Sequence, residues 1–329
     1  MIVRRLFVAS ATVAGLVWAA PRVVAARVRR TPDDDPDTVL GPLPGRERIV
    51  PTHDGGKIRV IEAGAPDAPT IVLAHGVTLS NRVWVRQFAA LPGRGFRVVA
   101  YEHRGHGESS VGESGHSVEN LALDLRAVLE VLDLRDVVVV GHSMGGVAAQ
   151  ALAIEHPEIV ASRVRGIVLL SSLGYTPFGS RTTQLKERIG RVTDRMPDSR
   201  RVWESRHLGT ALARIGFGRR PRPSHVELVR RMMVECPPET RRDAPAQLVG
   251  LDLVADLPEL RVPTLVVCGT GDVITPPSES RRMANLIPGA RLELLRGGGH
   301  MLMLEQADAV DDLVVAFARE VGIAPRVPT

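Results

Sequence analysis

A run of small residues between a strand-like and a helix-like segment constrains the fold of this chain more than any other feature. Residues 137–140 are four valines in succession, typical of a buried strand, and residues 147–153 are small, mostly apolar helix formers. Between them, residues 141–146 read Gly-His-Ser-Met-Gly-Gly. Gly-x-Ser-x-Gly in this context predicts a tight turn that holds Ser143 clear of the sheet, beside the free N–H groups of a helix N-terminus. The same glycines could mark only close packing, so a serine nucleophile needs partners elsewhere in the chain.

Strand-like and helix-like segments alternate along most of the remaining chain. Runs rich in β-branched residues predict strands at residues 58–62, 71–74, 98–101, 137–140, 167–170, 265–268 and 292–295. Helical periodicity predicts helices at residues 121–132, 147–155, 280–286 and 309–321. The alternation predicts an α/β fold with a mostly parallel sheet covered by helices on both faces. Residues 174–245 carry only short helical patterns and prolines, so we expect a helical lid or cap inserted into a core of residues 46–173 and 246–329.

The composition is that of a globular protein without a nucleic-acid-binding surface. Of 329 residues, 44% are hydrophobic and 3% aromatic, and the formal charge of +5 comes almost wholly from arginine. Because no basic stripe is interleaved with aromatic side chains, we expect no nucleic-acid partner. The two cysteines, Cys236 and Cys268, show no metal-ligand spacing, and a serine nucleophile needs neither a metal nor an organic cofactor.

The first thirty residues differ in character from the rest of the chain. Arg4 and Arg5 precede an uncharged stretch at residues 6–20, and further arginines follow it. We therefore expect residues 1–30 to be a hydrophobic leader or membrane anchor, which would make the chain membrane-associated or exported, with the side of the membrane left open. An amphipathic or disordered extension is the alternative. Residues 31–45 are acidic and rich in proline, which indicates a linker.

Two further loops carry candidate partners for the serine. Reactive groups on parallel sheets gather beyond the carboxyl ends of the strands. Asp272 follows strand 265–268 on a glycine-bounded loop, and His300 follows strand 292–295 after three glycines. Each has an ordinary explanation by itself, since aspartates often cap their own loops and loop histidines are often only solvated. The order Ser143, Asp272, His300, with each residue after its own strand, favours a catalytic triad.

From about residue 46 onward, the chain resembles the α/β-hydrolase fold family of serine esterases and lipases. His75-Gly76-Val77 is similar to the oxyanion-hole loop of that family, and residues 101–109 are similar to its Arg-Gly-x-Gly-x-Ser loop. The turn at residues 141–146 resembles the nucleophile elbow of monoacylglycerol-lipase-like esterases. The resemblance implies that Ser143 is the nucleophile, that His300 is the general base and that Asp272 orients it. It also implies an oxyanion hole formed by the backbone N–H groups of Val77 and Met144.

The expected function is hydrolysis of carboxylic esters, including lipid-like esters, through an acyl-enzyme intermediate. The same three side chains could instead serve an acyltransferase, a perhydrolase or a carbon–carbon bond hydrolase, and a non-catalytic binding protein is a further alternative. The predicted insertion should select the substrate. We expect its apolar residues, together with His75 of the core, to line the substrate site: Leu208, Leu212, Phe217, Met232 and Met233.

The predicted insertion is also rich in arginine. Its arginines include Arg219, Arg220, Arg222, Arg230 and Arg231. A solvated surface explains them most simply, and contact with anionic lipid headgroups at a membrane surface is the alternative. The sequence leaves the physiological substrate, the acyl chain length and the oligomeric state open.

Overall fold

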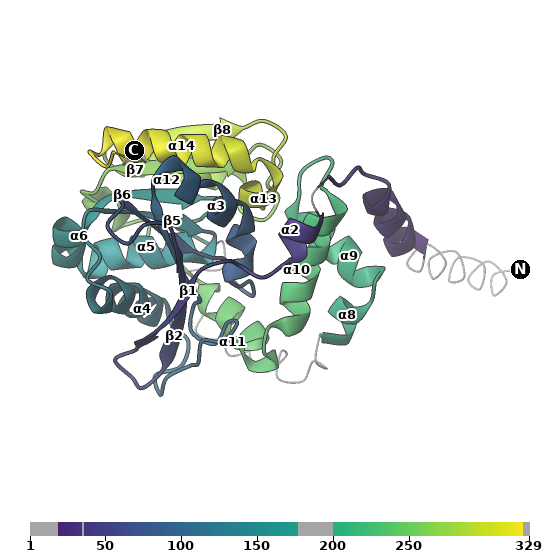
Figure 1. Ribbon diagram of the computed structural model, residues 1–329, viewed down its shortest axis with the longest axis horizontal. Helices are drawn as coiled ribbons and strands as arrows, with labels where there is room; N and C mark the ends of the chain where they lie inside the picture. The colour runs from purple at the N-terminus through teal and green to yellow at the C-terminus, as the bar shows by residue number, and fades with distance from the viewer. Residues whose placement is uncertain (1–18, 35, 177–199, 325–329) are drawn as a thin grey trace, which may run out of the picture.

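Eight strands form one sheet in the computed structural model, which describes residues 19–34, 36–176 and 200–324. The strands are β1 (Arg46–Pro51), β2 (Lys57–Ala63), β3 (Thr70–Ala74), β4 (Arg97–Tyr101), β5 (Val137–His142), β6 (Val164–Leu170), β7 (Thr264–Gly269) and β8 (Arg291–Leu295). Their order in the sheet is β1-β2-β4-β3-β5-β6-β7-β8. Figure 1 gives an overall view of the chain. β2 pairs antiparallel with both β1 and β4, and every other pairing is parallel. The predicted, mostly parallel sheet is confirmed.

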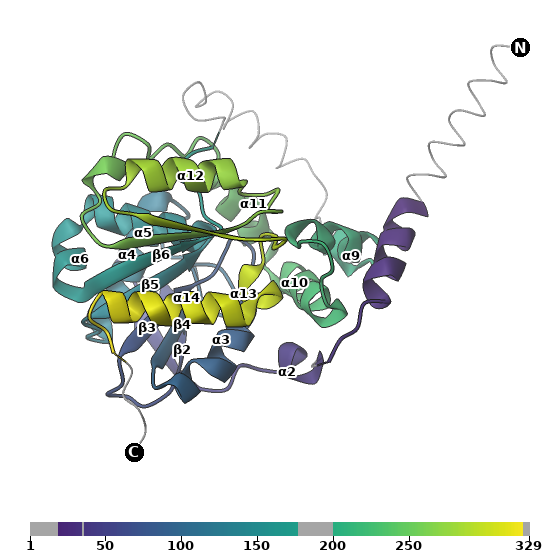
Figure 2. The ribbon, with the colours of Figure 1, turned by 90° about the horizontal axis from the view of Figure 1, so that it is seen from above.

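Helices cover both faces of the sheet (Figure 2). On one face lie α3 (Val85–Ala90) and α14 (Ala307–Glu320). On the other lie α4 (Val118–Val131), α5 (Met144–Glu155), α6 (Pro157–Arg163) and α12 (Pro277–Leu286). The four valines of β5 show why both faces need cover. Val138 and Val140 pack into the first layer, whereas Val137 and Val139 pack into the second, since successive strand side chains point to opposite faces.

Strand β1 is absent from the sequence-based prediction. Apart from Val50, its residues are exposed, because it forms one edge of the sheet. Arg46 and Arg48 each make an ion pair of 2.9 Å with the buried carboxylate of Glu62 on β2. Charged side chains are an ordinary feature of edge strands, and they hide such strands from any search for apolar runs.

Shorter elements complete the chain. They are α2 (Pro36–Leu40), η1 (Asn81–Trp84), η2 (Pro92–Arg94), η4 (Leu257–Glu259) and α13 (Leu302–Glu305). The segment between β6 and β7 adds α8 (Arg200–Glu204), α9 (Leu208–Ala213), η3 (Arg214–Gly216), α10 (Pro223–Glu235) and α11 (Pro238–Leu248). Helices α8, α9 and α10 lie together beside the sheet-and-helix body (Figure 1). Helix α11 continues through Pro245, so the predicted end of the insertion falls inside a helix. Its role as a lid stays a prediction, and residues 177–199 lie outside the described residues.

The prediction of membrane association or export through the N-terminal segment is wrong on the evidence of the described chain. Across residues 19–34, 36–176 and 200–324, no helix combines the length and the apolar character needed to cross a bilayer. Residues 19–29 form a helix on which Ala25 and Val28 are buried, and Val28 joins the main hydrophobic core. Most of the predicted apolar stretch, residues 6–18, lies outside the described residues.

The predicted linker is tied to the rest of the protein at α10. The carboxylate of Asp33 accepts hydrogen bonds from the backbone N–H of Ser224 at 2.6 Å and from its hydroxyl at 2.9 Å. Asp34 makes an ion pair of 2.7 Å with Arg222. An acidic segment is well placed here because the N-terminus of a helix carries unpaired N–H groups and a partial positive charge. Asp33 of the linker therefore caps α10.

Candidate active site

Ser143 stands on a strained turn between β5 and α5. Its backbone has φ of 51° and ψ of −115°, the mirror image of an extended conformation, which glycine adopts readily and other residues rarely. The turn is held on both sides: the N–H of Ser143 donates to the carbonyl of Leu170 at 3.0 Å, and its carbonyl accepts from the Ser172 hydroxyl at 2.8 Å. A side chain at Gly145 would overlap the carbonyl of Ala74 on β3. The glycine therefore allows α5 to approach the sheet closely enough to form the turn.

Asp272 and His300 form a buried hydrogen-bonded pair. Nδ1 of His300 lies 2.9 Å from Oδ2 of Asp272, and because an ionised carboxylate can only accept, the ring donates from Nδ1. The backbone N–H groups of Ile274 and Thr275 both donate to Oδ1 of Asp272 at 2.9 Å, and the Thr275 hydroxyl donates to Oδ2 at 2.7 Å. Burial by itself would raise the pKa of Asp272. The hydrogen bond and charge of His300, together with the hydrogen bonds from Thr275, outweigh the effect of burial, so the pKa lies below its usual value. The pair is thus arranged to keep a carboxylate against the imidazole.

His142 connects the serine turn to the histidine loop. Its ring centroid lies 4.6 Å from that of His300, and its Nε2 lies 3.0 Å from the carbonyl oxygen of His300, to which it donates. Burial, followed by the nearby His300, holds the pKa of His142 well below its usual value, so the ring is neutral. A Cβ built on Gly76 would lie 2.8 Å from Nδ1 of His142 and 3.2 Å from Cβ of Ser143. The loops that carry Gly76, Ser143 and His300 therefore meet at His142.

The groups that would take part in the chemistry make no hydrogen bonds to other described parts of the protein. Within the described ranges, neither the Ser143 hydroxyl nor Nε2 of His300 has a hydrogen-bond partner. The same holds for the backbone N–H groups of Val77 and Met144. Val77 packs against the buried cluster that contains Met144, so these two donors belong to neighbouring loops. Catalytic hydrogen bonds are often long or unformed without substrate, and free donors at a helix N-terminus can receive a developing oxyanion.

His75 is completely buried. Its Nδ1 lies 2.7 Å from the carbonyl of Gly76, and its Nε2 accepts from the backbone N–H of His103 at 3.1 Å. His106 is engaged in the same way, with Nε2 accepting from Thr78 at 3.0 Å. Burial lowers the pKa of His103 to about 3 and that of His106 to about 4, so both are neutral braces of their loops. Contact between His75 and a substrate stays a prediction, with no ring nitrogen free to make it.

The apolar residues predicted to line the substrate site have different surroundings. Phe217 and Met232 are 3% and 2% exposed and belong to the main core, whereas Leu208 is 38% exposed and Leu212 is partly buried. Met233 lies near the loop that carries Val77, because its sulfur accepts a hydrogen bond of 2.9 Å from the Thr78 hydroxyl. Their role as a substrate pocket stays a prediction.

Glu305, on α13, holds the histidine loop and was not identified from the sequence. Its carboxylate accepts from the backbone N–H of Gly218 at 2.6 Å and from that of Gly299 at 3.0 Å. The N–H of His300 itself donates to the carbonyl of Gly216 at 2.9 Å. The residues after α9 are thus hydrogen-bonded to the loop that carries His300, both directly and through Glu305. A glutamate that follows an apolar run has no distinctive sequence signal, whereas Thr275, three residues after Asp272, fits a local turn pattern that a search could have used.

No metal site accompanies this arrangement in the described ranges. No three side chains of the His, Cys, Asp and Glu types come together there as metal ligands.

Comparison with known proteins places this architecture in a family. A family model described as alpha/beta hydrolase fold matches residues 69–307. The chain is 29% identical over 279 residues to a non-heme chloroperoxidase of Burkholderia pyrrocinia, which covers 82% of this chain and 99% of that protein. A non-heme haloperoxidase of Rhodococcus erythropolis is 30% identical over 276 residues, covering 82% and 98%. The solved structure of a thermophilic esterase from Thermogutta terrifontis matches with a TM-score of 0.69 and 28% identity, covering 84% and 99%. The fold and the family model agree, and the chain belongs to the α/β-hydrolase fold family.

Proposed function

We propose that this protein hydrolyses carboxylic esters through an acyl-enzyme intermediate formed on Ser143. The observation that carries the proposal is the buried hydrogen bond of 2.9 Å between Asp272 and His300, on loops that meet the strained turn of Ser143. Since Nδ1 of His300 is occupied as a donor to Asp272, Nε2 is the ring nitrogen left to accept a proton. A neutral imidazole with a free Nε2 is the general base that a serine hydroxyl requires.

The proposed reaction has two steps, formation of the acyl-enzyme and its hydrolysis. Oγ of Ser143 attacks the ester carbonyl carbon while Nε2 of His300 takes the hydroxyl proton, and the oxyanion is held by the N–H groups of Val77 and Met144. The bond to the alcohol then breaks, and the leaving alkoxide takes the proton from His300. Water next attacks the acyl-enzyme and gives a proton to His300, which returns it to Oγ as the carboxylic acid leaves. Asp272 stays ionised throughout and stabilises the imidazolium, in keeping with its lowered pKa.

The test is hydrolysis of p-nitrophenyl esters of increasing acyl chain length by the full chain and by Ser143→Ala. We expect Ser143→Ala to lower kcat by about a million-fold, the scale measured when such a nucleophile is removed. Ser162→Ala is the control, because Ser162 is an exposed serine on α6 whose hydroxyl hydrogen-bonds only to carbonyls of its own helix. A fluorophosphonate probe should label the chain at Ser143. Full activity of Ser143→Ala, or labelling of another serine, would refute the proposal.

Transfer of the acyl group to hydrogen peroxide is a second candidate, favoured by the likeness to relatives named chloroperoxidase and haloperoxidase. Peroxide would replace water in the second step and give a peracid, with the proton handled by His300 as before. The rate of peracid formation in a mixture of ester and peroxide, compared with the rate of acid formation, separates the two activities. Because both require the acyl-enzyme, loss of both in Ser143→Ala is expected.

A further inference from the structure

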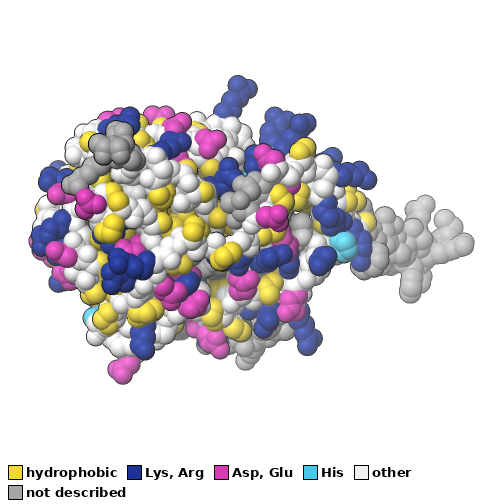
Figure 3. Space-filling model, in the orientation of Figure 1, with side chains coloured by type: hydrophobic (Ala, Val, Ile, Leu, Met, Phe, Trp, Pro, Cys, Tyr) yellow, Lys and Arg dark blue, Asp and Glu magenta, His cyan; other side chains and the backbone are white. Residues whose placement is uncertain are grey.

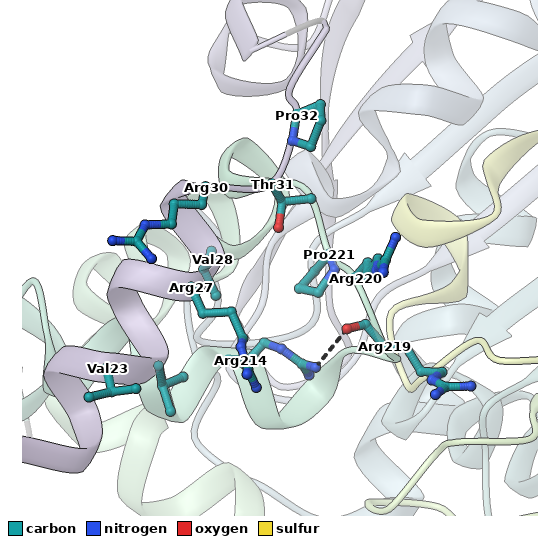
Figure 4. A pocket seen from close by; sticks show the side chains of 11 residues that line it. Val23, Arg27, Val28, Arg30, Thr31, Pro32, Arg214, Arg219, Arg220 and Pro221 are labelled. Carbon is teal, nitrogen blue, oxygen red and sulfur yellow. Dashed lines mark hydrogen bonds between the residues drawn. The ribbon is translucent and has the colours of Figure 1, made fainter.

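A cavity of about 650 Å³ lies between the helix at residues 19–29 and the segment after α9, the same segment that contacts the loop of His300 (Figure 4). Five arginines contribute to its lining, and none of its lining residues is acidic: the arginines are Arg27, Arg30, Arg214, Arg219 and Arg220. The remaining lining residues are mostly apolar, and they include Val23, Val24 and Val28. The space-filling view shows basic side chains gathered over this end of the molecule (Figure 3). The cavity therefore combines positive charge with an apolar wall.

Four of the five arginines that line this cavity have no ion-pair partner within the described ranges. Arg27, Arg30, Arg219 and Arg220 form no ion pair with any described carboxylate. Three acidic residues lie next to the segments that line the cavity, and the charge of one of them, Glu305, acts on Arg214. Asp33 caps α10 at Ser224, Asp34 pairs with Arg222, and the carboxylate of Glu305 accepts from Gly218 and Gly299. An anion entering the cavity would thus meet cations that have no competing partner.

Arg214 is fixed in place before any ligand arrives. One of its terminal nitrogens donates to the carbonyl of Phe217 at 2.7 Å and the other to the carbonyl of Arg219 at 3.3 Å. These carbonyls orient the guanidinium without cancelling its charge. Figure 4 shows Arg27 reaching toward Arg214 from the opposite wall. Burial lowers the pKa of Arg214. The charge of Glu305 opposes this effect, and the charge of Arg27 lowers the pKa further, as expected when two cations approach each other.

We propose that this cavity binds an amphiphilic anion, with a phosphate or carboxylate head between Arg27 and Arg214 and a short alkyl chain against Val23, Val24 and Val28. Guanidinium groups bind both kinds of head through charge-assisted hydrogen bonds, and the valines remove the alkyl chain from water. Val23 is 64% exposed, so an alkyl chain that covers it would remove apolar surface from water.

Calorimetric titration of the full chain tests the site. The probes are n-octyl phosphate and octanoate, with inorganic phosphate and the neutral octyl glucoside as comparisons. We expect both amphiphilic anions to bind more tightly than either comparison compound. Arg27→Gln should weaken their binding about tenfold, the value of one charge-assisted hydrogen bond, and Arg27→Glu should abolish it. The control is Arg319→Gln on α14, which removes an exposed arginine far from the cavity and should change affinity less than about twofold.

The thermal midpoint supplies a second measurement that does not depend on ligand. Arg27→Glu replaces repulsion across the cavity by attraction to Arg214, so the midpoint of the free protein should rise, while octyl phosphate should stabilise only the unmodified chain. Binding of octyl phosphate that survives in Arg27→Glu, or that falls equally in Arg319→Gln, would overturn the site. Octyl glucoside binding as tightly would overturn the need for charge, and inorganic phosphate binding as tightly would overturn the role of the valines.

Discussion

The strain in the backbone of Ser143 predicts that the residue costs stability, and two matched variants can measure that cost. Ser143→Ala and Ser143→Gly both remove the hydroxyl, so both should be inactive under the proposed function. They differ in one methyl group and in backbone freedom. At φ of 51° and ψ of −115°, alanine keeps the strain, whereas glycine is relaxed. We therefore expect Ser143→Gly to be the more stable variant, although glycine normally weakens a fold.

The size of the difference follows from two opposing terms. A non-glycine residue in a sparsely populated backbone region costs about 1–3 kcal/mol. Glycine also lowers the free energy of unfolding by about 0.4–1 kcal/mol, because it gives the unfolded chain more conformational freedom. The free energy of unfolding of Ser143→Gly should thus exceed that of Ser143→Ala by about 1–2 kcal/mol. At about 2.1 cal/mol/K per residue, a chain of 329 residues has an unfolding entropy of about 0.7 kcal/mol/K, so the thermal midpoint should rise by about 2 °C.

Urea unfolding followed by circular dichroism gives both free energies, and scanning calorimetry gives the midpoints. The slope of the free energy with urea should be the same in both variants, since neither changes the surface exposed on unfolding. The corresponding pair at a relaxed helical position, Ala148→Gly on α5 against the unmodified chain, should show the opposite sign. If Ser143→Ala equals or exceeds Ser143→Gly in stability, the turn stores no strain and the reasoning fails.

Three further predictions concern buried carboxylates. Asp272→Asn should lower kcat for p-nitrophenyl acetate by about 10⁴-fold, because an amide no longer fixes the imidazole tautomer; a loss below tenfold in steady-state assays would contradict this role. Glu305→Gln replaces one of the two carboxylate oxygens that accept from backbone N–H groups by an amide donor, so kcat should fall by about 10–100-fold with little change in KM. The exposed Glu204→Gln should match the unmodified enzyme. Burial raises the pKa of Asp311 to about 6, so its carboxyl group binds a proton more tightly in the folded state than in the unfolded chain. The free energy of unfolding therefore falls as pH rises from about 4 to about 6. Asp311→Asn should therefore add about 3 kcal/mol at pH 8 and almost nothing at pH 4, and equal urea midpoints of the two proteins at pH 8 would show that the carboxylate is not destabilising.

Local patterns were sufficient for much of the fold. Strands such as β5 and β7 are runs of β-branched residues that cannot be left in water, and α4 has the apolar periodicity of a helix that covers a sheet. The glycines around Ser143 similarly predict a tight strand-to-helix turn, and the structure adds the reason, since a side chain at Gly145 would overlap Ala74. These elements are readable because each signal lies within a few neighbouring residues.

Features that depend on distant segments could not be read in this way. β1 is stabilised by ion pairs to Glu62, and an exposed edge strand carries no apolar signal. The expected membrane segment is not supported, since no described helix is long and apolar enough to cross a bilayer, and Ala25 and Val28 of the helix at residues 19–29 are buried.

The sequence by itself determined the alternation of most strands with helices, and it identified Ser143, Asp272 and His300 as candidate site residues. Only the tertiary structure decided that His142 and Glu305 hold the histidine loop, and that arginines from two separate segments share one cavity. The physical reason is range: side-chain type and periodicity act between near neighbours in the chain, whereas hydrogen bonds and charges act between whichever groups folding brings together.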